Sequence, residues 1–138
     1  MSTIINTRAL LALANEARDK SYSPYSGITV GAALLTADGK IYKGNNIENA
    51  SYTPTVCAER VAFFKAISEG EKHFIAIAVA GGPAGETAKA DFPPCGVCRQ
   101  VMAEFCGPDF NVIWGNEEKI TVRKLKEILP DSFNKSNL

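Results

Sequence analysis

The segment FIAIAVA, residues 74–80, decides the fold. All seven of its side chains are apolar, and isoleucine or valine stands at every second position. A short run of this kind is typical of a strand that is covered on both faces, because neither set of alternate side chains is suited to water. We therefore expect residues 74–80 to lie at the centre of a sheet with helices on both sides.

The residues that precede this strand predict a helix and a hairpin. A helix over about 6–20 is indicated by apolar residues at helical spacing, namely Leu10, Leu13, Ala14 and Ala17. Residues 21–27 are rich in serine, proline and glycine and are expected to form a loop. The turn signal Asp38-Gly39 separates two candidate strands, 30–35 and 41–44.

A second helix is expected after the polar segment 45–51. Thr53, followed by Pro54, or Thr55 could cap it, and Gly70 would end it. Its expected buried residues are Val56, Phe63, Phe64 and Ile67.

The residues that follow the central strand predict a long loop and then further helices and strands. The glycines and prolines of 81–94 indicate the loop, and 95–105 has a helical pattern. Later expected elements are strands at 111–114 and 118–120 and a helix over 122–129, with Thr121 as its cap and Pro130 as its stop. This order predicts one α/β domain over residues 1–138.

The composition limits the classes of function. The 138 residues include 15 Lys plus Arg and 15 Asp plus Glu, so no net charge attracts a phosphate backbone or an anionic membrane. A small neutral substrate fits this balance better. No segment approaches the roughly 20 apolar residues of a membrane span, and Met1-Ser2-Thr3 leads into a mixed helix and not into a signal peptide. We therefore expect a cytoplasmic protein.

Three cysteines have the spacing of metal ligands. Cys95 and Cys98 lie three positions apart at the start of a predicted helix, and Cys57 lies in the first turn of another. Alone, C-x-x-C could also be a redox pair or half of a structural zinc site. Together the three thiolates would leave one tetrahedral position open, which is the mark of a catalytic zinc site.

Glu59 follows Cys57 by two positions and could carry protons between a zinc-activated water and a substrate. Arg60 and the two helix N-termini could offset the negative charge of three thiolates. Cys106 as a fourth ligand would make a closed structural site. It lies about 12 Å from Cys98 along the helix axis, which favours a buried thiol. His73, the only histidine, is interpreted as a surface or strand-edge residue.

The motifs C-A-E-R at 57–60 and P-C-G-V-C-R-Q at 94–100 resemble those of the zinc-dependent cytidine deaminases, in particular the small homotetrameric type with three cysteines on zinc. The resemblance also covers shorter segments: PYS at 24–26, VGAALL at 30–35, GNNIENA at 44–50 and LP at 129–130. It implies a three-layer α/β/α sandwich with one mixed sheet of roughly five strands.

The resemblance assigns a role to each candidate site residue. It implies one zinc ion per subunit on Cys57, Cys95 and Cys98, with Glu59 as the proton carrier in the hydrolytic deamination of cytidine and 2'-deoxycytidine. The implied substrate contacts are Asn46 and Glu48 to the ribose hydroxyls, the Ala58 amide to the base carbonyl, Ile28 to the pyrimidine, and Phe133 to the active site of a neighbouring subunit. Arg60 would donate hydrogen bonds to the thiolates.

Two positions depart from the family pattern. Ile28 stands where members of the family commonly carry an aromatic residue, so it offers apolar area without a stacking face. Residues 52–55 form a variable stretch before Cys57. Three other functions remain open: a related deaminase such as blasticidin S deaminase, a polynucleotide deaminase, which the absence of a basic groove with aromatics disfavours, and a non-enzymatic module in which all four cysteines bind zinc.

Overall fold

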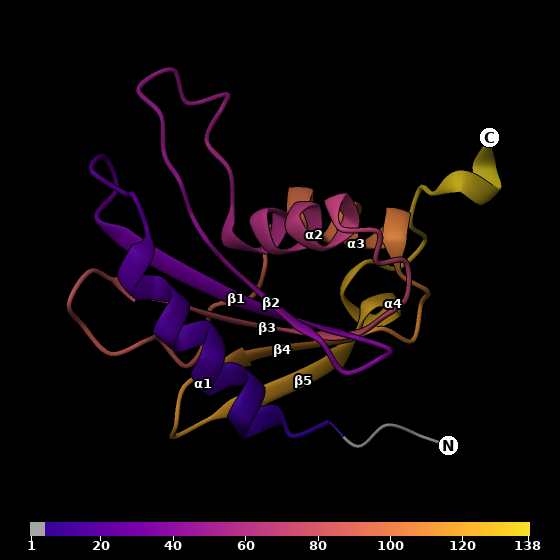
Figure 1. Cartoon of the computed structure of the whole chain (residues 1–138), viewed down its shortest axis with the longest axis horizontal. Helices are drawn as coiled ribbons and strands as arrows, with labels where there is room; N and C mark the ends of the chain where they lie inside the picture. Colours follow the sequence, from indigo (N-terminus) through magenta and orange to yellow (C-terminus); the bar gives the residue numbers. More distant parts are fainter. Residues whose placement is uncertain (1–4) are drawn as a thin grey trace.

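The computed structural model of the protein describes residues 5–138. Within that range the sheet has five strands in the order β2-β1-β3-β4-β5 (Figure 1). The strands are β1 (Ile28–Thr36), β2 (Ile41–Asn45), β3 (Phe74–Pro83), β4 (Asn111–Gly115) and β5 (Ile120–Lys124). Strand β3 pairs antiparallel with β1 and parallel with β4, so the sheet is mixed and the segment FIAIAVA lies at its centre, as predicted.

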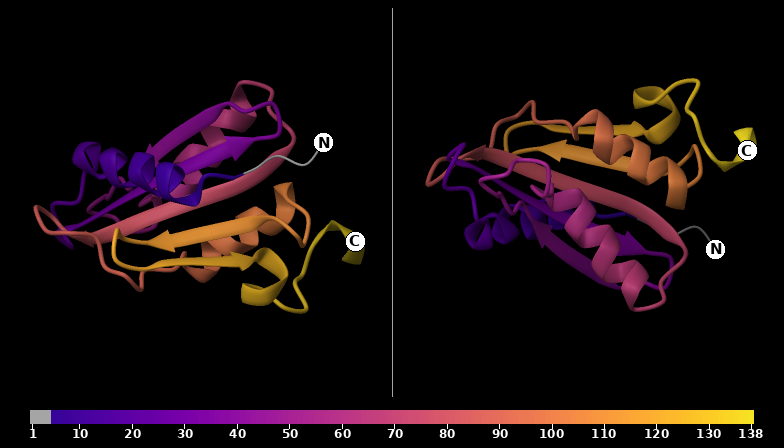
Figure 2. Two further views of the ribbon diagram at one scale, coloured as in Figure 1. Left: turned by 90° about the horizontal axis from the view of Figure 1, so that it is seen from below. Right: turned by 90° about the horizontal axis from the view of Figure 1, so that it is seen from above.

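Helices cover both faces of the sheet. Helix α1 (Thr7–Ala17), which a 3-10 turn extends through Arg18–Lys20, lies on one face, whereas α2 (Ala58–Ser68) and α3 (Gly96–Phe105) lie on the other (Figure 2). The short helix α4 (Leu125–Ile128) contacts α3, and a 3-10 turn over Lys135–Asn137 closes the chain. The predicted three-layer α/β/α sandwich is therefore confirmed.

Strand β3 divides the core into two layers of different composition. Its alanines at positions 76, 78 and 80 face α1, where Leu10, Leu11 and Ala14 pack against them. Ile77 and Val79 point to the opposite face and join the cluster that contains Phe63 of α2 and Met102 of α3. The small side chains of the first face let α1 approach the sheet closely, and the larger ones fill the space beneath two helices.

The start of α2 differs from the prediction. The N-cap is Cys57, not Thr53 or Thr55, and Val56 lies outside the helix in a bridge to Ile47. This backbone pairing, between residues nine positions apart, keeps Val56 extended. Phe64 is 48% exposed, whereas the expected Phe63 is fully buried. The predicted stop is confirmed, because Gly70 takes a positive φ directly after the last turn.

Further element boundaries were predicted wrongly. The expected strand 118–120 lies at 120–124. Thr121, expected as the cap of a helix, and Val122, expected as its first residue, pair with Trp114 and Ile113 of β4. Helix α4 is consequently only four residues long, with Lys124 as its N-cap. Strand β3 continues to Pro83, so the connecting loop begins at residue 84.

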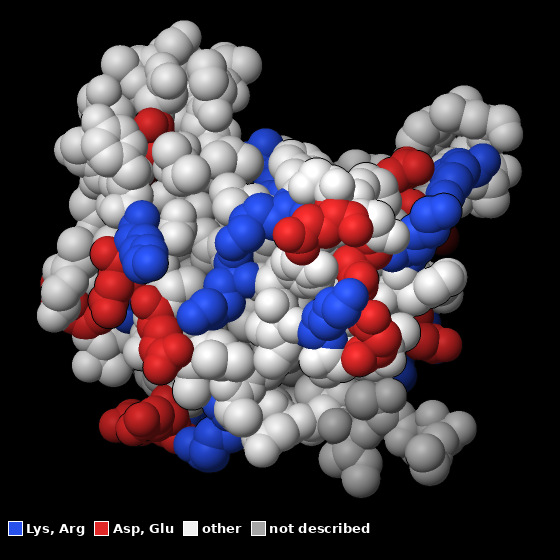
Figure 3. Space-filling model, in the orientation of Figure 1, with Lys and Arg blue, Asp and Glu red and all other residues white. Residues whose placement is uncertain are grey.

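Charges of both signs are dispersed over the molecule. On the face shown in Figure 3, lysine and arginine side chains alternate with aspartate and glutamate, and neither sign dominates. Among residues 5–138, no helix has both the length and the apolar character that crossing a membrane demands.

Candidate active site

The predicted metal ligands lie at the starts of two helices on the same face of the sheet. Cys57 is the N-cap of α2, Cys95 is the N-cap of α3, and Cys98 lies in the first turn of α3. Within the described residues, neither N-cap cysteine makes a side-chain capping hydrogen bond. Their sulfurs are therefore free to face one another across the gap between the helix starts.

The three sulfurs have the separations that a tetrahedral cation requires. The Cys57 and Cys95 sulfurs are 3.8 Å apart, and those of Cys95 and Cys98 are 3.6 Å apart. All three lie within 4.8 Å of one another. Zinc–sulfur bonds of about 2.3 Å at tetrahedral angles give a sulfur–sulfur edge of about 3.8 Å. The donor set and its spacing thus fit zinc.

Positive charge and thiol donors stabilise the Cys57 thiolate. A hydrogen bond with Cys98 and the guanidinium of Arg60, whose Nη2 donates to the Cys57 sulfur at 3.3 Å, lower the pKa of Cys57 to about 5. The same hydrogen bond with Cys57, together with burial, raises the pKa of Cys98. Both helix N-termini also favour negative charge at this place. The Cys57 thiol is thus ionised at neutral pH.

Glu59 lies beside this cluster in the first turn of α2. Its side chain is 4% exposed, and burial, reinforced by the nearby negative charge of Cys57, raises the pKa of its carboxyl to about 7. A carboxyl with a pKa near neutrality can both accept and donate a proton. Its position next to Cys57 suits it to serve a water bound at the open metal position.

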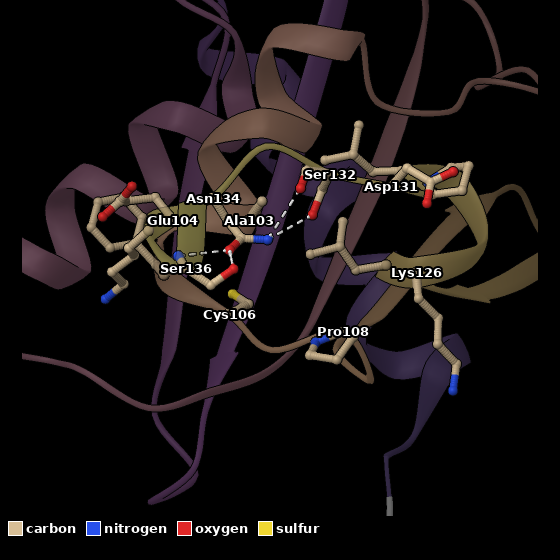
Figure 4. Close-up of a pocket in the computed structure, with 14 residues that line it drawn as sticks. Ala103, Glu104, Cys106, Pro108, Lys126, Asp131, Ser132, Asn134 and Ser136 are labelled. Carbon is tan, nitrogen blue, oxygen red and sulfur yellow. Dashed lines mark hydrogen bonds between the residues drawn. The ribbon is translucent and has the colours of Figure 1, made fainter. Parts of the chain in front are cut away.

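Cys106 lies elsewhere. It is the C-cap of α3, at the opposite end of the helix from Cys95, and burial raises the pKa of its thiol to about 12. It lines a cavity of about 860 Å³ between the end of α3, α4 and the C-terminal segment (Figure 4). Among the described residues, the potential metal cluster therefore consists of three cysteines, with Cys106 excluded.

A small backbone ladder brings the segment that contains Asn46 and Glu48 next to the cysteines. Ile47 pairs with Tyr22 on one side and with Val56 on the other. The amide of Ile47 donates to the Val56 carbonyl at 3.0 Å, and the amide of Val56 donates back at 2.9 Å. Because Val56 directly precedes Cys57, residues 46–48 lie beside the start of α2, which the polar composition of 45–51 had not indicated.

Both predicted ribose-binding side chains are engaged by the protein itself. The Asn46 oxygen accepts from the Val30 amide, and its Nδ2 donates to the Ile28 carbonyl, each at 2.9 Å. The Glu48 carboxylate accepts from the amides of Tyr25 and Ser26 and from the Ser26 hydroxyl, which lowers its pKa. These bonds fasten both side chains to the start of β1 and the loop before it.

The other predicted contacts are more dispersed. Ile28 is the half-buried first residue of β1, and Ala58 is the fully buried first residue of α2. Phe133 is 60% exposed and lies in the C-terminal segment, whose carbonyl at this residue accepts from Gln100 Nε2 at 2.7 Å.

Arg99 also ties the C-terminal part of the chain to α3. Its guanidinium donates to the carbonyls of Pro94 and Ile128 at 2.8 and 2.9 Å. Together with Gln100 it connects the C-x-x-C motif to the last residues of the chain. Both positions belong to the quoted motif R-Q, which was the available signal for this connection.

A buried glutamate beside three sulfurs that fit a tetrahedral cation defines a zinc-dependent hydrolase site. The family model of the cytidine and deoxycytidylate deaminase zinc-binding region matches residues 5–114. This chain belongs to that family, and its cofactor is zinc.

Individual relatives agree along nearly the whole chain. The cytidine deaminase of Sporosarcina psychrophila is 46% identical, over 97% of this chain and 96% of its own length. That of Halalkalibacterium halodurans is also 46% identical, over 97% of this chain and 98% of its own. The crystal structure of cytidine deaminase from Burkholderia pseudomallei superimposes with a TM-score of 0.84 at 44% identity, covering 94% of this chain and 100% of that one.

Proposed function

We propose that the protein catalyses the hydrolytic deamination of cytidine and 2'-deoxycytidine to uridine and 2'-deoxyuridine, with release of ammonia, as a step of pyrimidine salvage. The observation that carries the proposal is the buried Glu59 beside the cluster of Cys57, Cys95 and Cys98. The 46% identity with two cytidine deaminases over nearly full length supports the choice of substrate.

The zinc ion would be bound by Cys57, Cys95 and Cys98. Arg60 would partly neutralise the negative charge of the Cys57 thiolate through its hydrogen bond to that sulfur. When bound, zinc supplies a water that is acidic enough to act as a nucleophile at neutral pH. Proton transfer and substrate binding would be carried out by residues of this chain.

Glu59 would move the protons. Its carboxylate accepts a proton from the water that attacks C4 of the cytosine ring and delivers it to N3. It then accepts the second proton of that water and delivers it to the 4-amino group, which leaves as ammonia. A pKa of about 7 matches this double duty, because neither direction of transfer is strongly uphill.

The nucleoside would be bound by the segments that join the start of β1 to the start of α2. Asn46 retains one N–H donor and Glu48 retains acceptor capacity beyond their internal hydrogen bonds, so the pair can both donate to and accept from the ribose hydroxyls. The Ala58 amide would bind the base carbonyl, and Ile28 would give the pyrimidine an apolar contact.

We also propose that the chain is a single catalytic domain that assembles into a homotetramer with shared active sites. The C-terminal segment and the loop after β2 project on either side of α2 and α3 (Figure 1). The loop, the two helices and the C-terminal segment carry apolar side chains that are 48–74% exposed: Tyr52, Phe64, Val97 and Phe133. Contact with a second copy would bury them. A cytoplasmic location remains a prediction.

A direct assay tests the proposed function. The purified protein is incubated with cytidine, 2'-deoxycytidine and blasticidin S, and the loss of the 4-amino group is followed by ultraviolet absorbance. Turnover of the two cytosine nucleosides is expected. Turnover of blasticidin S alone would favour the alternative deaminase, and no turnover by zinc-loaded protein would favour a zinc-stabilised module.

Substitution of Glu59 tests the mechanism. Glu59→Gln keeps the shape of the side chain but removes its proton transfer, so we expect kcat to fall about a thousandfold with bound zinc unchanged. The matched control is Glu104→Gln, which changes an exposed glutamate of α3 and should leave activity intact. Full activity in zinc-replete Glu59→Gln would refute the mechanism.

A further inference from the structure

Arg18 is a buried cation far from the cysteine cluster in sequence and on the other side of the sheet. It follows the last residue of α1 and is 7% exposed. Its guanidinium spans three elements: Nε donates to the carbonyl and the hydroxyl of Thr29 in β1, Nη1 donates to the Asn15 side chain in α1, and Nη2 donates to the Pro83 carbonyl in β3, all at 3.1 Å.

These partners are neutral. Among residues 5–138 Arg18 forms no salt bridge, and burial lowers its pKa. The charge of the neighbouring Asp19 opposes this shift without forming a salt bridge. A buried charge costs free energy unless its donors are well satisfied, and here backbone carbonyls, a hydroxyl and an amide satisfy them. Lysine would not reproduce this arrangement, because its single nitrogen cannot take the places of Nε, Nη1 and Nη2, each of which bonds a different residue.

The Thr29 and Pro83 carbonyls, which accept from Arg18, lie at the end of the sheet where β1 starts. The proposed nucleoside-binding residues are near this end. Ile28 is paired with Pro83, and Thr29 with Gly82, at the last rungs of the β1–β3 ladder. Beyond these rungs β1 gives way to the loop 21–27, whose Tyr25 and Ser26 amides bind Glu48. Arg18 thus fixes the point from which that loop departs.

Asn46 contacts the two residues of β1 that lie on either side of Thr29. Its side chain bonds the Ile28 carbonyl and the Val30 amide, the peptide groups that flank Thr29. The backbone of 28–30 is therefore fixed by Arg18 at Thr29 and by Asn46 at the neighbouring positions. A shift of this backbone would move Ile28 and Asn46 together, whereas Cys95 and Cys98 lie at the start of α3, a separate element.

We propose that Arg18 is a positioning residue for the nucleoside half of the active site, acting through the backbone of 28–30; this inference rests on the proposed function. It touches neither the zinc ligands nor Glu59. Its loss should therefore weaken substrate binding and leave the chemical step intact.

The test compares KM with kcat in the zinc-loaded enzyme. Arg18→Gln is expected to raise KM for cytidine about tenfold, with kcat within about twofold of wild type and zinc stoichiometry unchanged. The KM of Arg18→Lys should be much closer to that of Arg18→Gln than to that of the wild type. Thr29→Val removes only the hydroxyl that accepts from Arg18 and should show a smaller rise in KM. This variant provides the test if the Arg18 variants do not fold.

The control is Leu11→Ala, which weakens the packing of α1 on the same face of the sheet without touching 28–30. If KM rises equally in Leu11→Ala and Arg18→Gln at equal loss of thermal stability, Arg18 is merely structural and the proposal is overturned. Equal losses of kcat and kcat/KM in Arg18→Gln would overturn it as well.

Hydrogen–deuterium exchange separates this inference from the proposed function. Arg18→Gln should accelerate exchange in peptides that contain 28–30 more than Leu11→Ala does, whatever the enzyme deaminates. Unchanged exchange would refute the positioning role, whereas a wild-type protein inactive on cytidine but sensitive at 28–30 would refute only the proposed function.

Discussion

The carboxyl group of Glu59 retains its proton to a higher pH in the folded protein than in the unfolded chain. Its pKa rises from 4.5 to about 7, first because it is buried and then because Cys57 is negative. Below pH 4.5 both states are protonated. Between pH 4.5 and about 7 only the unfolded state ionises, so the contribution of Glu59 to stability falls as pH rises, and above that range the loss is complete.

The zinc-free protein should show this loss when it is compared with Glu59→Gln. The difference in unfolding free energy should move in favour of the variant by about 3 kcal/mol between pH 4.5 and pH 7.5, because each tenfold change in proton affinity corresponds to about 1.4 kcal/mol. Urea unfolding of both proteins after chelation provides the measurement. A difference in unfolding free energy that is independent of pH would contradict the assignment.

The sequence predicted the chemistry of single residues best where partners are close along the chain. Cys57 and Glu59 are two positions apart, and Cys95 and Cys98 three, so each pair lies within one helical turn. Arg18, by contrast, contacts Thr29 and Pro83, and its partners could not be identified before the sheet was known.

The close contact between β2 and α2 makes Gly44 sensitive to any side chain. A Cβ atom there would overlap the carbonyl oxygen of Ala58 and lie 2.6 Å from the amide nitrogen of Ala62. Gly44→Ala should therefore displace the first turn of α2, which carries Glu59 and follows Cys57. We expect bound zinc to fall and kcat to drop at least about tenfold.

Gly31 provides the control on the opposite face. A Cβ atom there would overlap the Ala14 carbonyl of α1, so Gly31→Ala should destabilise the fold by a similar amount while zinc stays bound. Zinc content measured by a colorimetric chelator, alongside thermal unfolding, distinguishes the two variants. Equal zinc loss in both would show that Gly44 has no special relation to the metal site.

For helices and strands, the sequence predicted which elements are present better than it predicted where each begins and ends. The apolar run at 74–80 and the helical pattern at 6–20 depend on burial, which local composition reports. The limits of β5 and α2 depend instead on remote pairing: Val122 is extended because it lies against Ile113, and Val56 because it lies against Ile47. No local propensity encodes those partners.

At the scale of the whole molecule, Phe133 is 60% exposed in the C-terminal segment. If this ring enters the active site of a neighbouring subunit, Phe133→Ala should raise KM for cytidine about tenfold and weaken the oligomer. Leu138→Ala, which removes a side chain that is 97% exposed, should change neither. Sedimentation velocity and steady-state kinetics provide the measurements. An unchanged KM in Phe133→Ala would place the ring outside the substrate site.

The sulfurs come from two segments that lie on either side of β3 in the chain, Cys57 before it and Cys95 and Cys98 after it. During folding, neither segment alone has three ligands, so high-affinity zinc uptake must wait until β3 has joined the two halves of the sheet. The rate of zinc binding in a stopped-flow refolding experiment would therefore report the rate at which the sheet is completed. A nascent chain that still lacks residue 95 would bind zinc only weakly.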